Sequence, residues 1–147
     1  NLAMIEQNIE FNYLSASTNM LNAVALNKDY LPLIVECAYS LIKAKRYQDY
    51  VDLYFTLNDT IKANGRVKML LGACYAKLGI LDKAIDIINK DLVVDDIKEG
   101  EYALSAIWTD IYKKVLANTL GKPEDEILDK DVLKAYPLPY ELDFRMH

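Results

Sequence analysis

Histidine and long apolar runs are scarce in this sequence, and each scarcity excludes a class of function. The one histidine is the last residue, His147, so a histidine-based metal site or a catalytic histidine is not expected. No apolar run approaches the roughly 18 residues that cross a bilayer, so we expect no membrane partner. Phosphate-binding glycine loops and the GxSxG elbow are also missing. We therefore predict that the chain is not an enzyme and needs no cofactor or metal.

Basic residues are fewer than acidic ones, and cysteine is rare. The 17 Lys and Arg against 22 Asp and Glu give a formal net charge of −5. Nucleic acids need clustered basic side chains, so we expect no nucleic-acid partner. Cys37 and Cys74 lie in apolar helical patterns without a CxxC motif. We interpret them as small buried hydrophobic residues in a reducing compartment, rather than a disulfide or a metal site, and expect a cytoplasmic location.

A repeated helical hairpin is the main feature of the sequence, and its clearest unit covers residues 65–98. Apolar spacing predicts one helix over 67–78 and a second over 81–92. Gly79 stands between them, where glycine commonly ends a helix. Gly72 is small where the two helices of a hairpin cross closely. The unit is therefore predicted to be a tightly packed helix pair.

Two further units, which match less well, lie about 34 and 68 residues before the clearest one, as expected for a repeat with a period of about 34 residues. The first of them places Ala38 at the position of Gly72, but it places Tyr50 where the clearest unit has the small Ala84. The second has the aromatic, small and apolar positions of a second helix: Tyr13, Ala16, Met20 and Ala23. Three phased units predict an array of stacked hairpins over residues 1–98.

These units resemble the tetratricopeptide repeat (TPR), and the matching residues of the clearest unit are Leu71-Gly72, Tyr75, Leu78-Gly79, Asp82 and Ala84. The resemblance implies an all-α, right-handed superhelix whose first unit is truncated, with only residues 2–8 left of its leading helix. A sequence that begins inside an array is interpreted as a piece of a longer protein. Unpaired apolar residues near Met4, Ile5 and Ile9 then predict weak self-association.

Residues 99–147 depart from the repeat and are predicted to cap it within the same domain. Apolar spacing from Leu104 predicts one helix that ends at Gly121 and carries Trp108 in the core. Pro123 followed by three acids predicts the start of another helix. The prolines at 137 and 139 predict an extended tail, with Leu142, Phe144 and Met146 along one side and Arg145 paired with a carboxylate.

The tail also resembles the C-terminus of bacterial multidomain proteins in which an uncharacterised, carbohydrate-related β-rich domain precedes TPR repeats; the matching residues are Leu142, Asp143, Phe144, Arg145 and Met146. Two functions follow as hypotheses. The first is a non-enzymatic protein-interaction or scaffolding domain, whose partner is a protein, a peptide or another part of its own parent chain. The alternative is an accessory domain that packs on the catalytic domain of a carbohydrate-active enzyme.

The TPR resemblance also implies a concave face lined by the first helix of each repeat, with these residues: Val35, Tyr39, Ile42, Lys43, Arg66, Met69, Ala73 and Lys77. Among them we take Tyr39, Lys43, Arg66 and Lys77 as the candidate binding residues. The three cations predict a basic patch for an acidic peptide or a terminal carboxylate. Ordinary surface charges are the alternative interpretation. The chain lacks the asparagines of a full carboxylate clamp, so binding of chaperone tails is not predicted.

Overall fold

The computed structural model of the 147-residue chain describes residues 2–98 and 100–145, and every regular element in these ranges is helical. The α-helices are α1 (Leu2–Leu26), α2 (Leu31–Lys43), α3 (Tyr47–Tyr54), α4 (Asp59–Lys62), α5 (Gly65–Lys77), α6 (Leu81–Ile87), α7 (Ala103–Leu120) and α8 (Asp129–Ala135). Two 3-10 helices, η1 (Glu124–Glu126) and η2 (Tyr140–Leu142), precede and follow α8 along the chain. The all-α prediction is confirmed.

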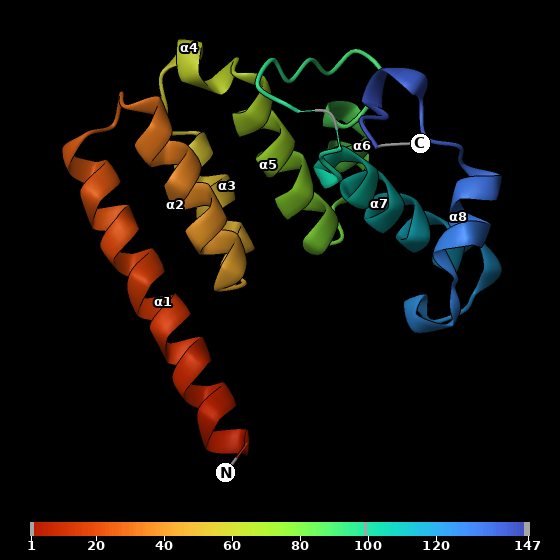
Figure 1. Cartoon of the computed structure of the whole chain (residues 1–147), viewed down its shortest axis with the longest axis horizontal. Coiled ribbons are helices and arrows are strands. Elements are labelled where there is room, and N and C mark those ends of the chain that lie inside the picture. The colour runs from red at the N-terminus through yellow and green to blue at the C-terminus, as the bar shows by residue number, and fades with distance from the viewer. Residues whose placement is uncertain (1, 99, 146–147) are drawn as a thin grey trace.

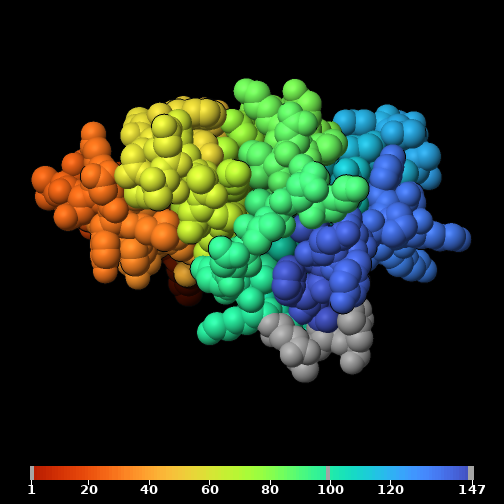
Figure 2. All heavy atoms as spheres, turned by 90° about the horizontal axis from the view of Figure 1, so that it is seen from above, coloured from red at the N-terminus to blue at the C-terminus, as the bar shows by residue number. Residues whose placement is uncertain are grey.

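The helices follow one another across the molecule in chain order (Figure 1). α2 packs on α1 and α3, while α5 packs on α2, α3, α6 and α7. α8 lies against α7 at the opposite end from α1. The view from above shows the same progression from the N-terminal helix to the C-terminal segments (Figure 2). The chain is therefore a linear array, in which each helix contacts its near neighbours in sequence.

α5 is the most deeply buried helix, and a glycine allows its close contact with the segment after α6. Eight of its 13 residues are buried. A Cβ atom on Gly72 would lie 2.7 Å from both Cγ1 and Cδ1 of Ile88, which is itself fully buried. The predicted small position at the helix crossing is thus confirmed. Gly79 has a φ of 75° and ends this helix as expected.

The last hairpin is shorter than the sequence predicted. α6 ends at Ile87, whereas the apolar pattern predicted a helix to residue 92. Asn89 explains part of this difference, because its side chain donates to the carbonyl of Asp86 and accepts from the amide of Asp91. Such local side-chain bonds compete with helical ones. The segment then passes close to the start of α5, where a Cβ on Gly65 would overlap the carbonyl oxygen of Val93.

The first predicted unit is a single helix, so the prediction of a separate leading helix over residues 2–8 is wrong. α1 runs unbroken from Leu2 to Leu26, because neither glycine nor proline interrupts it. Tyr13, the aromatic position of this unit, is 43% exposed and is therefore not a core residue. Only Ser17 and Val24 of α1 are buried. The helix packs on α2 mainly through its second half.

Tyr50 in α3 shows how the divergent middle unit is accommodated. Its ring is fully buried, although the repeat pattern favours a small residue there. The hydroxyl donates to the carbonyl of Val67 in α5 at 2.9 Å, and burial raises its pKa. A buried tyrosine usually needs such a partner. The bulky side chain therefore fills the space between α3 and α5.

The segment after α7 packs on α7, and its local structure differs in part from the prediction. α7 ends at Gly121, whose φ is 64°, and Trp108 is buried, so both expectations are confirmed. The acids after Pro123 form only the 3-10 turn η1. The helix starts later, at Asp129, because Ile127 is buried in an extended conformation between them.

The tail is fixed to the body but is not a strand. Tyr140–Leu142 form a 3-10 turn instead of the predicted extended segment. Leu142 is nevertheless fully buried, and the amide of Gly100 donates to the carbonyl of Phe144 at 2.6 Å. Arg145 pairs with Asp143 at 2.9 Å, which confirms a carboxylate partner. Met146 lies outside the described residues.

Candidate functional site

Tyr39 and Lys43 lie one turn apart on α2 and are both exposed. They line a shallow hollow of about 370 Å³ together with Tyr13 and Ala16 of α1, and with Glu36 and Ser40 of α2. A second hollow, which Tyr13 and Lys43 also line, adjoins Glu10 and Lys45. Within the described part of the chain, Lys43 has no ion pair. This region therefore combines an aromatic ring, an apolar floor and an available ammonium group.

Arg66 lies at the start of α5 and is engaged by the chain's own acids. Its guanidinium group donates to both carboxylate oxygens of Asp96 at 2.9 Å. It also donates to Glu101 in a two-bond arrangement at 3.0 and 3.2 Å, and to the hydroxyl of Tyr39 at 2.7 Å. The side chain is only 11% exposed. The predicted free cation is therefore a structural link between α2, α5 and the loop before α7.

The electrostatics of this cluster agree with its geometry. The hydrogen bonds with Glu101 are the largest cause that raises the pKa of Arg66, against the opposing effect of burial. Reciprocally, Arg66 lowers the pKa of Glu101. Glu101 also accepts from the backbone amide of Lys98 at 3.2 Å. Because two carboxylates face one guanidinium group, the cluster carries a net negative charge and does not attract an acidic ligand.

Lys77 lies at the other end of α5 and faces α7. Its ammonium group is 3.3 Å from Asp110, and Asp110 also pairs with Lys114 at 2.7 Å. Arg66 and Lys77 are eleven residues apart on one helix, which corresponds to about 16 Å along its axis. The predicted patch of three cations is therefore not assembled as one free surface: Lys43 alone of the three is without an ion pair among the described residues.

Two further findings concern the predicted concave face. Met69 is fully buried, so it does not line a groove as the resemblance implied. The structure does bring Tyr39 and Arg66 together through their hydrogen bond. Sequence reasoning missed Asp96 and Glu101 as the partners of Arg66, because they follow it by 30 and 35 residues through an irregular loop. These separations are close to the repeat period of about 34 residues, which is the one signal in the sequence from which such a contact could have been expected.

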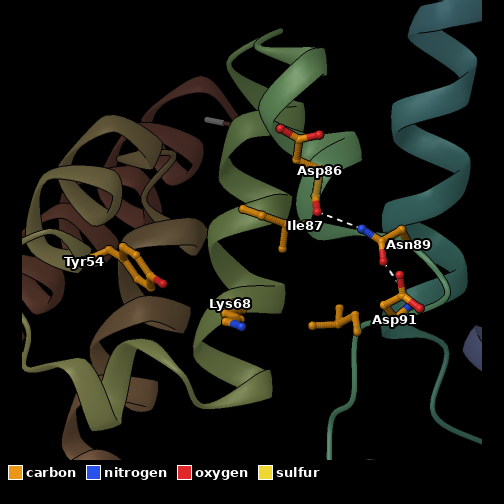
Figure 3. A pocket seen from close by; sticks show the side chains of 7 residues that line it. Tyr54, Lys68, Asp86, Ile87, Asn89 and Asp91 are labelled. Atoms are coloured by element: carbon orange, nitrogen blue, oxygen red, sulfur yellow. Dashed lines mark hydrogen bonds between the residues drawn. The ribbon is translucent and has the colours of Figure 1, made fainter.

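Another hollow lies between α3, α5 and the segment after α6 (Figure 3). It has a volume of about 260 Å³, and its polar lining includes Lys68, Asp86 and Asp91. The two bonds of Asn89 drawn in Figure 3 shape its wall at 2.7 and 2.9 Å. None of the predicted site residues lines it. The bonds of Asn89 belong to the bend that ends α6, and the Tyr54 hydroxyl donates to the carbonyl of Lys62.

The two thiols are buried and free, which confirms them as buried residues. Burial raises the pKa of Cys37 to about 11, although the nearby Arg46 opposes the shift. Burial also raises the pKa of Cys74 to about 12. A nucleophilic cysteine needs a lowered pKa and access. These thiols have neither property, and they behave as small apolar residues in the core.

Trp108 belongs to an aromatic cluster that joins α7 to the segment after α8. Its ring centroid is 4.3 Å from that of Tyr112, and Tyr112 stacks on Tyr136 at 4.7 Å. The indole nitrogen donates to the carbonyl of Tyr136 at 2.9 Å. Trp108 is 8% exposed, so it is a packing residue rather than a platform for a ligand.

Metal ligands and membrane-crossing helices were both sought among the described residues. Across residues 2–98 and 100–145, no group of three His, Cys, Asp or Glu side chains is placed to hold a metal ion. Nor is any described helix both long and apolar enough to cross a membrane. No protein-family model, curated protein or solved structure matches the chain significantly.

Proposed function

We propose that this chain is a non-enzymatic protein-interaction domain that binds a peptide or helix on the face formed by α1 and α2. The observation that carries the proposal is the hollow beside Tyr39 and Lys43. There an exposed phenol ring and an ammonium group that has no ion pair with a described residue adjoin Tyr13 and Ala16 of the neighbouring helix. Tyrosine supplies large contact area at low entropic cost, and lysine favours a carboxylate on the partner.

The array itself is proposed to be a TPR-like right-handed superhelix with residues 99–147 as its cap. Two observations support this proposal. Helix pairs α2–α3 and α5–α6 follow each other and pack directly. Their phased small residues, Ala38 and Gly72, are both buried. In stacked hairpins each unit contacts its neighbours, and extended faces remain available for partners. A scaffolding role in a cytoplasmic protein or for another part of the parent chain belongs to the same proposal.

The accessory-domain alternative stays a prediction from the tail resemblance. The described tail is used within this chain, because Leu142 is buried and Phe144 bonds to Gly100. Leu142 and Phe144 therefore make contacts within the chain's own fold. The interaction hypothesis is preferred since its residues are exposed.

A peptide selection tests the proposed function. A random peptide library is panned against the wild-type chain, and the selected peptides are titrated against Lys43→Glu and Tyr39→Ala. We expect apolar peptides that place a carboxylate, such as a free C-terminus, beside Lys43, and their affinity should fall about tenfold in each variant. Lys68→Glu reverses an exposed cation in a different hollow and should leave the affinity unchanged. Equal affinities for Lys43→Glu and wild type would contradict the proposal.

A further inference from the structure

The first half of α1 forms an arm that extends beyond the body of the molecule. All residues from 2 to 16 are exposed, and we call this segment the α1 arm. In Figure 1 its N-terminal part projects past the end of α2, with no other helix beside it. At 1.5 Å per residue these 15 residues correspond to about 22 Å of helix. An isolated helix of this length is only marginally stable in water.

One side of the α1 arm is an apolar stripe at three- and four-residue intervals: Leu2, Ile5, Ile9, Tyr13 and Ala16. Leu2 is 71% exposed and Ile9 is 45% exposed. Such spacing is the pattern of a helix that packs on another helix. The stripe ends at Tyr13 and Ala16, which line the hollow beside Tyr39 and Lys43. The arm and the hollow therefore form one continuous surface.

The charges beside the stripe indicate the chemistry of its partner. Glu6 and Glu10 are exposed one turn apart on one flank, and they are the only charged residues among the 25 residues of α1. Neither makes an ion pair with a described residue. Asn8 and Asn12 occupy the opposite flank. Glu10 also lines a hollow with Lys43 and Lys45, so the acidic flank is unopposed toward the N-terminal end of the arm, at Glu6. A complementary helix therefore has Lys or Arg on the flank that faces this end.

Self-association, predicted from the apolar residues, is the competing arrangement. In an antiparallel dimer of two α1 arms, the same flank of each helix meets its copy. Glu6 and Glu10 of both copies would then lie on one side without a basic residue between them. Like charges at such positions are destabilising. The acidic flank therefore favours a basic partner over an antiparallel second copy.

We propose that the α1 arm docks an amphipathic helix with an apolar stripe and a basic flank, running parallel to α1. The orientation follows from Lys43 at the inner end of the surface. A parallel helix places its C-terminal end there, where a cation is favourable to the helix dipole and to a terminal carboxylate. This inference rests on the proposed protein-interaction function and names its partner class.

The test uses synthetic peptides that differ only on the flank. The first is a labelled 21-residue helix with Leu at the stripe positions, Lys on the flank and a free C-terminal carboxylate. The second carries Glu in place of each Lys. Fluorescence anisotropy with the full chain is expected to show at least tenfold tighter binding of the lysine peptide, and a weaker preference at high salt.

Variants of the chain locate the binding. The double variant Ile5→Gln and Ile9→Gln is expected to bind the lysine peptide at least tenfold more weakly than the wild type does. The double variant Glu6→Lys and Glu10→Lys is expected to bind the glutamate peptide more tightly than the lysine peptide. Phe11→Gln is the matched control, because Phe11 is 68% exposed and lies off the stripe. Circular dichroism verifies that each variant is folded.

The outcomes separate this inference from the proposed function. Binding of the lysine peptide that depends on Lys43 but not on Ile5 and Ile9 would overturn the α1 arm as the docking site and leave the hollow as an interaction surface. If every variant keeps the wild-type affinity and the wild-type preference between the two peptides, both the docking proposal and the proposed function are overturned. Sedimentation that shows a dimer abolished by the Ile5 and Ile9 changes would make a second copy the occupant and overturn the basic-helix proposal.

Discussion

At the scale of single residues, two kinds of position decide how the array is built. Gly72 permits contact with Ile88 that any side chain would obstruct. Arg66 holds separate segments through Asp96, Glu101 and Tyr39. The first contact is steric and local, and the second is electrostatic and joins residues more than 25 positions apart. Both contacts can be tested by single substitutions.

Gly72→Ala is expected to destabilise the fold by about 1 kcal/mol, because overpacking costs about 1–3 kcal/mol while helix propensity returns about 1 kcal/mol. Ile88→Val removes one of the obstructing atoms. Urea denaturation of the double variant should therefore show a loss smaller than the sum of the two single losses.

Gly79→Ala is the matched control for this pair. It makes the same chemical change at a φ of 75° with no atom within 4 Å, so it should destabilise through backbone strain alone. Its effect is expected to add to that of Ile88→Val. If the losses in free energy of unfolding from Gly72→Ala and Ile88→Val also add without a difference, the close contact between these two residues is unimportant.

Glu101→Gln is expected to lower the free energy of unfolding at pH 7 by about 1 kcal/mol, because it removes a charge-assisted bond to Arg66. The pKa of Glu101 is lowered in the folded chain. Its contribution is thus complete above the unfolded pKa of about 4.3 and is lost as pH falls through the folded pKa.

The difference between wild type and Glu101→Gln should accordingly shrink as pH is lowered below about 4.3. Thermal or urea unfolding over a pH series measures it. Glu36→Gln, at an exposed glutamate without an ion pair to a described residue, should show no comparable difference. A pH-independent difference for Glu101→Gln would contradict the ion pair.

At the scale of helices, the sequence predicted the regular elements better than their ends. Gly79 and Gly121 stop α5 and α7 where expected, since glycine adopts positive φ without strain. The end of α6 was missed because the bonds of Asn89 to nearby backbone override an apolar pattern. The start of α8 was missed because Ile127 is buried, which only tertiary packing decides.

α1 is the element whose stability should vary most along its length. Its second half packs on α2, and Arg46 donates to Ser17 and Thr18 at 3.0 and 2.8 Å. The α1 arm has no buried residue. Native-state hydrogen exchange should therefore be fast over residues 2–14 and slow in α5, which opens only with the whole fold. Equal protection in the two segments would show that the arm is covered.

At the scale of the whole molecule, the candidate site was only partly predictable. The TPR resemblance named Tyr39 and Lys43 as candidates, and the structure leaves both exposed one turn apart on α2. Arg66 and Lys77 have acidic partners in the loop before α7 and in α7 itself, which a one-dimensional pattern does not reveal. The available surface is therefore shifted from the middle of the array toward its first two helices.

The measurement that tests the central claim most directly is nuclear magnetic resonance mapping of a peptide selected by the wild-type chain. Backbone amide shifts are recorded during titration and assigned to the helices. The account predicts that the largest changes fall in α1 and α2, around Tyr13, Ala16, Tyr39 and Lys43. Changes concentrated instead around α7 and α8, with α1 and α2 unaffected, would contradict it.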